Sequence, residues 1–243
     1  MTEPQRAYHT LQHLYELFQN LDKIHSKVAD VDVVELAIFF HDIVYQTKGY
    51  SPGQNEHESA ELFLEYANQL KQAWIIEMGD HEETGLKWQS ATERVETYIR
   101  ATANHDHTVV DDGQSSDGNY FLDLDLLILA ASEDRYHNYT QQVRHEYTAP
   151  HGPFSRRQFL EGRLGFLASF LSKEQRFFRT MDHATEDQSR KNMAMELQSL
   201  RIELETTDRP QTVSRDTVAT VAISTVGLGL VLLFCMLHRR SAK

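Results

Sequence analysis

Histidine and aspartate side chains stand inside two strongly apolar stretches of the sequence, where each needs a compensating partner. His41 and Asp42 are adjacent in AIFFHDIVYQ, and Asp123 and Asp125 alternate with leucine in FLDLDLLIL. Burying an unpaired charge is costly enough that such groups are hydrogen-bonded, ion-paired or bound to a metal. On a helix, residues two apart point about 200° apart, so at most one of the two aspartates can face the His-Asp pair.

Two further pairs of histidines are placed to complete a metal site. His9 and His13 are four residues apart, so on a helix they share a side, and the apolar face of that helix lies nearer to His13. His105 and His107 end another predicted helix and could reach the rim of the site. Taken singly, each side chain is explained more simply by a hydrogen bond in the core. Taken together, imidazole and carboxylate indicate Mn, Fe, Co, Ni or Zn, with Mg depending more on oxygen ligands.

The elements that must position these residues are predicted to be helices. Apolar residues recur at helical spacing in residues 5–25, 32–45, 55–70, 91–104, 120–132, 133–148, 155–171 and 184–205. The polar stretches 78–90 and 106–119 are predicted loops. No alternating strand pattern of useful length interrupts the helices, so residues 1–206 are predicted to form one all-α domain.

Composition narrows the classes of function. The chain has 243 residues, of which 40% are hydrophobic, and this is compatible with a folded core. Its formal net charge of −12 argues against extended contact with nucleic acid, which requires a basic face. Cys235 is the single cysteine, so an intrachain disulfide is excluded and a reducing compartment is expected.

Residues 218–237 form a separate segment of twenty residues without a charge, VATVAISTVGLGLVLLFCML. As a helix this segment would be about 30 Å long, the thickness of the hydrocarbon core of a bilayer. A buried core helix rarely runs this far without a polar face. The sequence therefore predicts a transmembrane tail anchor over residues 217–238, joined to the domain by a linker at 207–216.

The orientation of this anchor is predicted from both ends of the chain. MTEPQRAYHT contains no apolar signal sequence, which favours a cytosolic domain. The basic residues Arg239, Arg240 and Lys243 beyond the span favour the opposite orientation weakly. A cytosolic domain is the prediction, with the mitochondrial outer membrane or the endoplasmic reticulum as the target membrane.

The order of residues along the chain, His13, then His41-Asp42, then Asp125, resembles the HD superfamily of metal-dependent phosphohydrolases. A narrower resemblance, to a small group of predicted HD-domain phosphohydrolases, rests on the segments EPQRAYHTLQHL, AIFFHDIVY, NEHESAELF, FLDLDLLILAAS and VRHEYTAP, with SRKNMAMELQSL after them. It covers most of residues 3–200. The tail lies outside the resemblance, and GDHEETGLKWQS is extra length within it.

This resemblance implies both a fold and a ligand set. The fold is an all-α HD-domain helical bundle, here with a C-terminal transmembrane helix, that brings four side chains to one divalent ion. Those side chains are His13, His41, Asp42 and Asp125. Some members of the superfamily carry further histidines and a second metal, for which His105 is the first candidate in this sequence and His9 the next.

A metal held in this way suits hydrolysis of a phosphate ester in a small phosphorylated metabolite or nucleotide. The ion lowers the pKa of a bound water, and Asp42 could both bind the ion and orient that water. Glu56, in the first turn of the next helix, could act as acid or base, or could simply favour the helix dipole. Asn55 could help that helix end to bind a phosphate oxygen, or could act as its N-cap. Arg6 could clamp a phosphate, or could be an exposed residue without a role.

Other residues and other functions stay open. Tyr45 stands where some superfamily enzymes carry an acid, so nucleotide specificity is not predicted. Arg144 and Glu146, in VRHEYTAP, are predicted to form a structural salt link. One alternative function is a ligand-binding or scaffolding HD module without turnover. The other is a di-iron HD oxygenase, which needs extra histidines and would be favoured by finding both His9 and His105 on metal.

Overall fold

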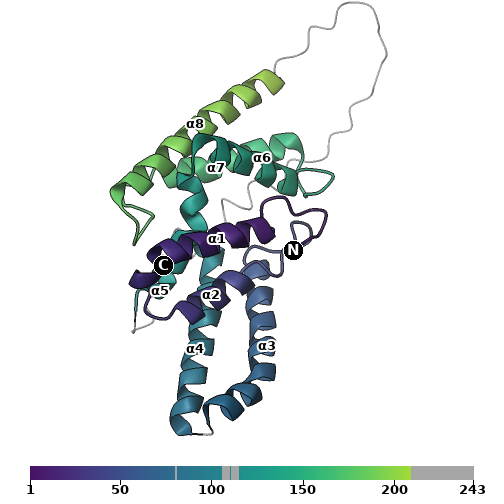
Figure 1. Cartoon of the computed structure of the whole chain (residues 1–243). Helices are drawn as coiled ribbons and strands as arrows, with labels where there is room; N and C mark the ends of the chain where they lie inside the picture. The colour runs from purple at the N-terminus through teal and green to yellow at the C-terminus, as the bar shows by residue number, and fades with distance from the viewer. Residues whose placement is uncertain (80, 106–109, 111–114, 209–243) are drawn as a thin grey trace, which may run out of the picture.

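The computed structural model describes residues 1–79, 81–105, 110 and 115–208, and all the helices and turns named below lie in that part of the chain. The α-helices are α1 (Leu11–Ile24), α2 (Val31–Phe40), α3 (Gln54–Met78), α4 (Glu82–Ala101), α5 (Asp117–Leu126), α6 (Glu133–Tyr147), α7 (Arg156–Leu171) and α8 (His183–Asp208) (Figure 1). Short 3-10 turns follow α1, α4 and α5. Every regular element of the described residues is helical, so the all-α prediction is confirmed.

The core consists of two apolar clusters. The first is built mainly on α1 to α5 and includes Val34 and Ile38 of α2, both fully buried, as expected for a helix that is apolar nearly all round. The second joins α6, α7 and α8 through residues such as Leu160 and Met193. Tyr8 belongs to the second cluster, so the segment before α1 packs against the α6–α8 part of the molecule. The candidate site lies where these two parts meet.

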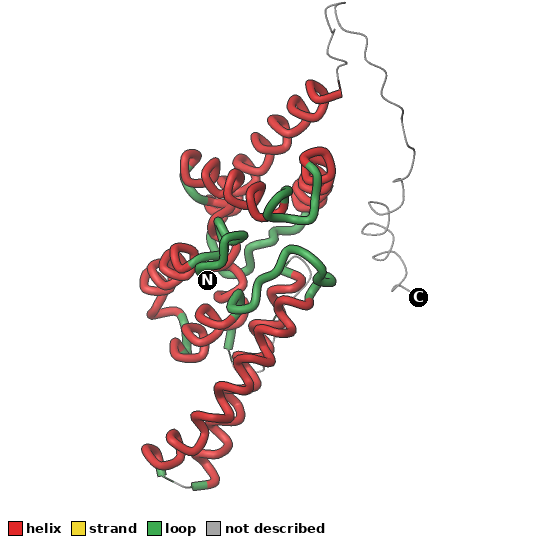
Figure 2. Tube along the Cα trace, turned by 90° about the vertical axis from the view of Figure 1, so that its right-hand side faces the viewer, coloured by secondary structure: helices red, strands yellow, loops and turns green. Residues whose placement is uncertain are grey.

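Helices α3 and α4 form a long antiparallel pair that extends away from the rest of the molecule (Figures 1 and 2). Residues 78–90 were predicted to be a loop, and this prediction is wrong, because most of them begin α4. Their polar character reflects an exposed helix, on which Lys87 donates to Glu83 at 2.8 Å. Trp74 and Trp88 pack together across the pair, with ring centroids 5.5 Å apart.

Two helix ends near the candidate site differ from the prediction. Helix α1 begins at Leu11, because the Thr10 side chain accepts a hydrogen bond from the Gln12 amide and caps the helix there. Helix α2 ends at Phe40, so His41 and Asp42 follow the helix and do not lie within it. His41 is the C-cap, which keeps right-handed helical backbone angles and donates its amide to the Ala37 carbonyl at 3.0 Å.

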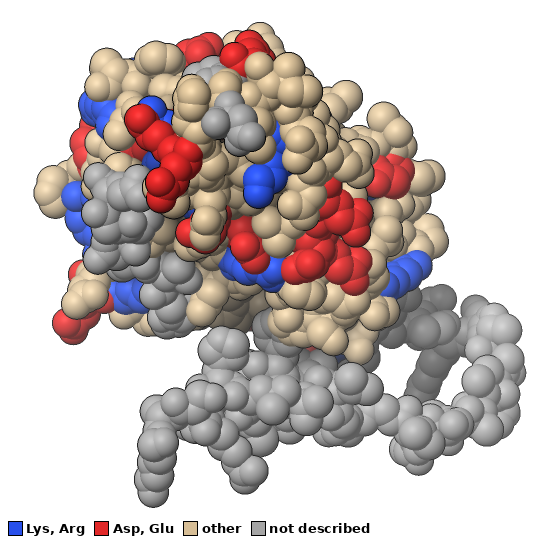
Figure 3. All heavy atoms as spheres, turned by 90° about the horizontal axis from the view of Figure 1, so that it is seen from below, with Lys and Arg blue, Asp and Glu red and all other residues tan. Residues whose placement is uncertain are grey.

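The predicted anchor at 217–238 and most of its linker lie outside the described residues, as does most of the predicted loop at 106–119. Within the part of the chain that is described, no helix is long and apolar enough to cross a membrane. The anchor therefore stays a prediction. Acidic side chains gather on the face that Figure 3 shows, in keeping with the net charge of −12.

Candidate metal centre

Three helices bring His13, His41 and Asp125 to one point. His13 lies on α1, His41 directly follows α2, and Asp125 is in the last turn of α5. The Nε2 atoms of the two histidines are 3.3 Å apart, and the Oδ1 atom of Asp125 is 3.2 Å from one and 3.6 Å from the other. The three ligand atoms all lie within 4.8 Å of one another, so this group could hold a metal ion.

Asp42 brings a second carboxylate to the two histidines, beside the group of three. Its Oδ2 atom is 3.0 Å from His41 Nε2 and 3.6 Å from His13 Nε2. Ligands at about 2.1 Å from an ion in tetrahedral or octahedral geometry are separated by about 3.0 to 3.4 Å. In addition, His41 Nδ1 donates to the Ile38 carbonyl at 2.8 Å, which leaves the Nε2 lone pair for an ion. Donor types and spacings therefore fit one divalent cation.

The charges of this group depend on one another. Burial lowers the pKa of His41, but the carboxylates of Asp42 and Asp125 raise it by more, so its pKa lies well above the ordinary value. Burial likewise opposes ionisation of both aspartates, and the positive charge of His41 outweighs it and holds their pKa values below the usual range. The carboxylates thus require a nearby positive charge, which a divalent ion would also supply.

Of the two aspartates on α5, Asp125 faces this group and Asp123 does not. Asp123 is fully buried and accepts hydrogen bonds from the Arg179 amide at 2.9 Å, the Thr180 amide at 2.6 Å and the Thr180 hydroxyl at 2.7 Å. It ties α5 to the chain before α8. The structure therefore places one aspartate of the pair in the site, as the helical spacing required.

His105 lies against the outer oxygen of Asp125. Its Nε2 atom is 2.9 Å from Asp125 Oδ2, and its Nδ1 atom is buried with no hydrogen-bond partner in the described part of the chain. Asp125 therefore contacts His13 and His41 through one oxygen and His105, the first candidate ligand for a second metal, through the other. The other predicted rim residue, His107, lies outside the described residues.

His9 reaches the site from a different position than predicted. Because α1 begins at Leu11, His9 precedes the helix and does not share a helical side with His13. Its Nδ1 atom is 2.7 Å from Glu146 Oε2, and its ring stacks on that of Tyr45 with centroids 4.1 Å apart. His9 is not among the residues whose ligand atoms could share an ion within the described chain.

Glu146 is the site residue whose role the sequence did not reveal. It is fully buried at the end of α6, and Tyr45 donates its hydroxyl to Oε2 at 3.1 Å. Oε1 accepts three backbone amides, those of Ala7 and Tyr8 at 2.7 Å and of His9 at 3.0 Å. Arg144 and Glu146 each form an ion pair, but with different partners, because Arg144 donates to Glu203 at 2.6 Å. The sequence signal that could have indicated the burial of Glu146 is its position three residues after Val143, on the inner face of α6.

This network predicts that Glu146→Gln destabilises the protein in a manner that depends on pH. Burial raises the pKa of Glu146, but the charge of His9 and the hydrogen bonds lower it by more, to about 2. A folded-state pKa below the unfolded value adds stability at neutral pH, roughly 3 kcal/mol here, that is lost as the pH falls from about 4.5 toward 2. Urea unfolding of wild type and variant should show their difference shrinking over that range.

Glu133→Gln, an exposed change on the same helix, is the matched control for this titration. It should differ little from the wild type at any pH. A wild-type advantage over Glu146→Gln that stayed constant down to about pH 3 would contradict the assignment of the charge to the folded network.

Two residues predicted to bind substrate are engaged elsewhere. The side chain of Arg6 is 1% exposed, and its guanidinium donates to the carbonyls of His9, Asp42 and Ile43. It clamps the chain after α2 to the N-terminal segment, which corrects the prediction of a phosphate clamp. Asn55 bonds both backbone groups of Gln46 at 2.9 Å. It is not the N-cap either, because α3 begins at Gln54 with Gly53 as its cap.

Glu56 is near enough to Asp42 for the two charges to interact. It is half-buried in the first turn of α3. Burial raises the pKa of Glu56, the charge of Asp42 raises it further, and the charges of His105 and His9 oppose both effects. A carboxyl group with a raised pKa at the edge of a metal site is suited to proton transfer.

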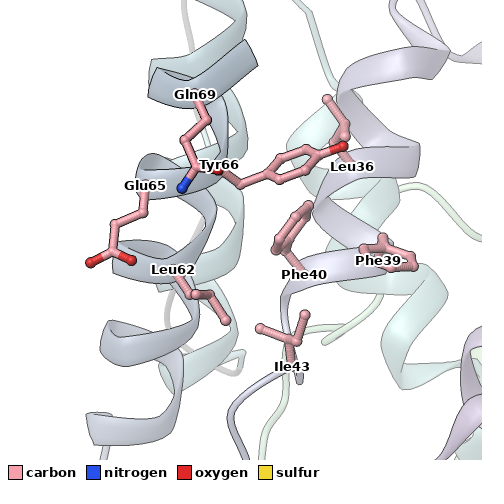
Figure 4. A pocket seen from close by; sticks show the side chains of 8 residues that line it. All are labelled: Leu36, Phe39, Phe40, Ile43, Leu62, Glu65, Tyr66 and Gln69. Carbon is pink, nitrogen blue, oxygen red and sulfur yellow. The ribbon is translucent and has the colours of Figure 1, made fainter.

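A groove of about 560 Å³ between α2 and α3 is separate from this chemistry (Figure 4). Its walls are mainly apolar, and they contain one carboxylate and no imidazole. The lining residues are Leu36, Phe39, Phe40, Ile43, Leu62, Glu65, Tyr66 and Gln69. None of them belongs to the metal group.

Comparison with known proteins adds no family assignment. No family model, no curated protein and no solved structure matches the chain. A functional conclusion therefore rests on the geometry of the described residues and on the resemblance of the motifs.

Proposed function

We propose that the protein is a divalent-metal-dependent phosphohydrolase of the HD type that acts on a small phosphorylated metabolite or nucleotide. The observation that carries this proposal is that the ligand atoms of His13, His41 and Asp125 meet at one point, with the Oδ2 atom of Asp42 at 3.6 Å and 3.0 Å from the two histidines. Two imidazoles and two carboxylates leave coordination positions for water and substrate. The metal is one of Mn, Co, Ni, Mg, Zn and Fe.

The carboxylates form the accessible side of the centre. The side chains of Asp42 and Asp125 are 16% and 15% exposed, whereas those of His13 and His41 are 3% and 1% exposed. Substrate and water therefore approach over the carboxylates, where Glu56 is also electrostatically coupled to Asp42. The bound ion would supply a more acidic water and neutralise charge on the phosphoryl group. Asp42 would orient that water, and Glu56 would carry a proton to the leaving oxygen.

The alternatives have less support from the geometry. A di-iron oxygenase needs extra histidines on metal, but the ion-pair partner of His9 in the described chain is Glu146, whereas His13, His41 and His105 each contact Asp42 or Asp125. A scaffolding module would not require four converging ligand atoms. The proposal includes a cytosolic catalytic domain anchored through residues 217–238, on the length and the lack of charge of that segment.

The test is metal-dependent phosphate release by residues 1–208 after removal of bound metal. We expect release from at least one nucleotide or phosphoester when Mn, Co, Ni, Mg, Zn or Fe is restored. Asp42→Ala should lower the rate by more than about 100-fold, since it removes both a ligand and the group that orients water. Asp22→Ala, an exposed change on α1, is the control and should keep full activity. Tight metal binding without turnover of any substrate would contradict the proposal.

A further inference from the structure

His9 and Glu146 form a pair beside the metal group, and nothing in the chemistry described above uses it. The two residues are 137 positions apart in the sequence, and His9 Nδ1 lies 2.7 Å from Glu146 Oε2. The same carboxylate holds three successive backbone amides, from Ala7 to His9. One buried side chain therefore fixes both the path of the chain before α1 and the orientation of the His9 ring.

The His9 ring is held between aromatic neighbours. It stacks on Tyr45 with centroids 4.1 Å apart and meets the ring of Tyr8 edge to face at 4.9 Å. Its centroid lies 5.9 Å from that of His13, a ligand of the metal group. Tyr45 is itself bonded to Glu146. The position of the ring is thus fixed by contacts with several side chains as well as by one hydrogen bond.

One nitrogen of this fixed ring is left open. A carboxylate only accepts, so Nδ1 is the donor toward Glu146 and Nε2 points away from it. No hydrogen bond or ion pair to Nε2 occurs within residues 1–79, 81–105, 110 and 115–208, and the side chain is 20% exposed. The buried carboxylate of Glu146, 2.7 Å from Nδ1, favours the charged form of the ring, an imidazolium with an Nε2–H.

The position of His9 distinguishes a substrate contact from a metal ligand. A histidine bonded to a carboxylate through Nδ1 is also the usual arrangement of a metal ligand. In the described chain, however, the ion-pair partner of His9 is Glu146 alone. The other three histidines of the site each contact Asp42 or Asp125. His9 therefore lies beside the ligand group, with its ring centroid 5.9 Å from that of His13 and outside the three residues that could share an ion.

We infer that Glu146 is a positioning residue that holds His9 so that its Nε2 donates to a phosphoryl oxygen of the substrate. This inference rests on the proposed phosphohydrolase function and deepens it, because it supplies the cationic phosphate contact that Arg6 does not provide. It assigns to the site a monoester or diester whose phosphoryl group spans the metal and His9. The imidazolium would neutralise part of the charge that develops on that group.

The test separates metal affinity from phosphate affinity in the full chain, purified in detergent and loaded with Mn²⁺. The probes are Mn²⁺ itself and inorganic phosphate, both measured by titration calorimetry. We expect His9→Gln to weaken phosphate binding about 10- to 100-fold, as for loss of a charge-assisted hydrogen bond, and to change Mn²⁺ affinity by less than about threefold. His13→Gln should lose Mn²⁺, and His137→Gln, an exposed histidine on α6, should change neither affinity.

Glu146→Gln tests the positioning role. It should weaken phosphate binding to a similar extent as His9→Gln, and the double variant should be no weaker than either, because both changes remove one interaction. Both single variants should also raise KM for the substrate found above by about the factor by which they weaken phosphate binding, with a further fall in kcat. Should Glu146→Gln fail to fold, His9→Gln decides, since it leaves the three backbone bonds to Glu146 in place.

Three results would overturn the inference. Loss of Mn²⁺ by His9→Gln, parallel to His13→Gln, would make His9 a metal ligand. Unchanged phosphate affinity and turnover in His9→Gln, with an active wild type, would reject the phosphate contact alone. A wild type that binds Mn²⁺ but neither binds phosphate nor releases it from any ester would reject the phosphohydrolase, and the inference with it.

Discussion

Asp125→Asn is expected to abolish metal binding, while Asp123→Asn, two residues away on α5, is expected to leave the metal bound and to lower stability. The Oδ1 atom of Asp125 lies 3.2 Å from His13 Nε2, and its Oδ2 atom lies 2.9 Å from His105 Nε2. Loss of its charge removes a ligand and leaves His41 without one of its two compensating carboxylates. We expect metal affinity to fall by more than about 100-fold and turnover to become undetectable.

Asp123→Asn is expected to leave the metal bound and to lower stability, because the Asp123 carboxylate forms hydrogen bonds that stabilise the fold. Its carboxylate accepts the amides of Arg179 and Thr180, and an asparagine NH₂ group would face one of those donors. Removing a fully buried acceptor of this kind costs about 2 to 4 kcal/mol. Metal content by elemental analysis and the free energy of unfolding in urea should be measured for both variants. Equal loss of metal in the two would contradict the assignment of their separate roles.

The histidine and aspartate ligands of this centre could be predicted from the sequence, because these polar residues stand inside apolar stretches. A charge within an apolar run, as at His41-Asp42, demands a partner regardless of the fold. Helical spacing then required Asp123 and Asp125 to point in different directions, as they do. The same reasoning could not say which of the two joins the site, since both lie between leucines. That distinction depends on the chain before α8, where Arg179 and Thr180 supply the partners of Asp123.

What could not be predicted depends on contacts between distant parts of the chain. Glu146 and His9 meet because Tyr8 packs into the α6–α8 cluster, and no local pattern encodes a pair 137 residues apart. Arg6 was expected to clamp a phosphate or to be exposed without a role, yet it is buried and donates to two carbonyls of the chain after α2. The loop predicted at residues 78–90 was wrong for a different reason. A helix that is exposed on most sides carries too few apolar residues to show a helical period.

Removal of the metal is expected to lower the thermal midpoint of unfolding. An ion that binds the folded state at about 100 times its dissociation constant adds about 2.7 kcal/mol. For a domain of this size the midpoint would fall by roughly 5 to 11 °C. Thermal unfolding followed with and without a chelator measures this difference. His13→Gln, which lacks a ligand, should show no effect of the chelator, and an equal effect in that variant would contradict binding at this centre.

The difference in thermal midpoint between the metal-bound and the metal-free protein should widen as the pH rises from about 6 to about 9. Burial lowers the pKa of His41, but Asp42 and Asp125 raise it by more, so the metal-free protein keeps this imidazole charged above the ordinary range. A raised folded-state pKa gives stability that is full below the unfolded value and is lost as the pH increases through the folded one. The metal-free protein should therefore lose stability with increasing pH. The ion competes with that same proton, so its binding strengthens as the proton leaves. If the difference instead narrowed with increasing pH, the ion would not be replacing a proton at His41.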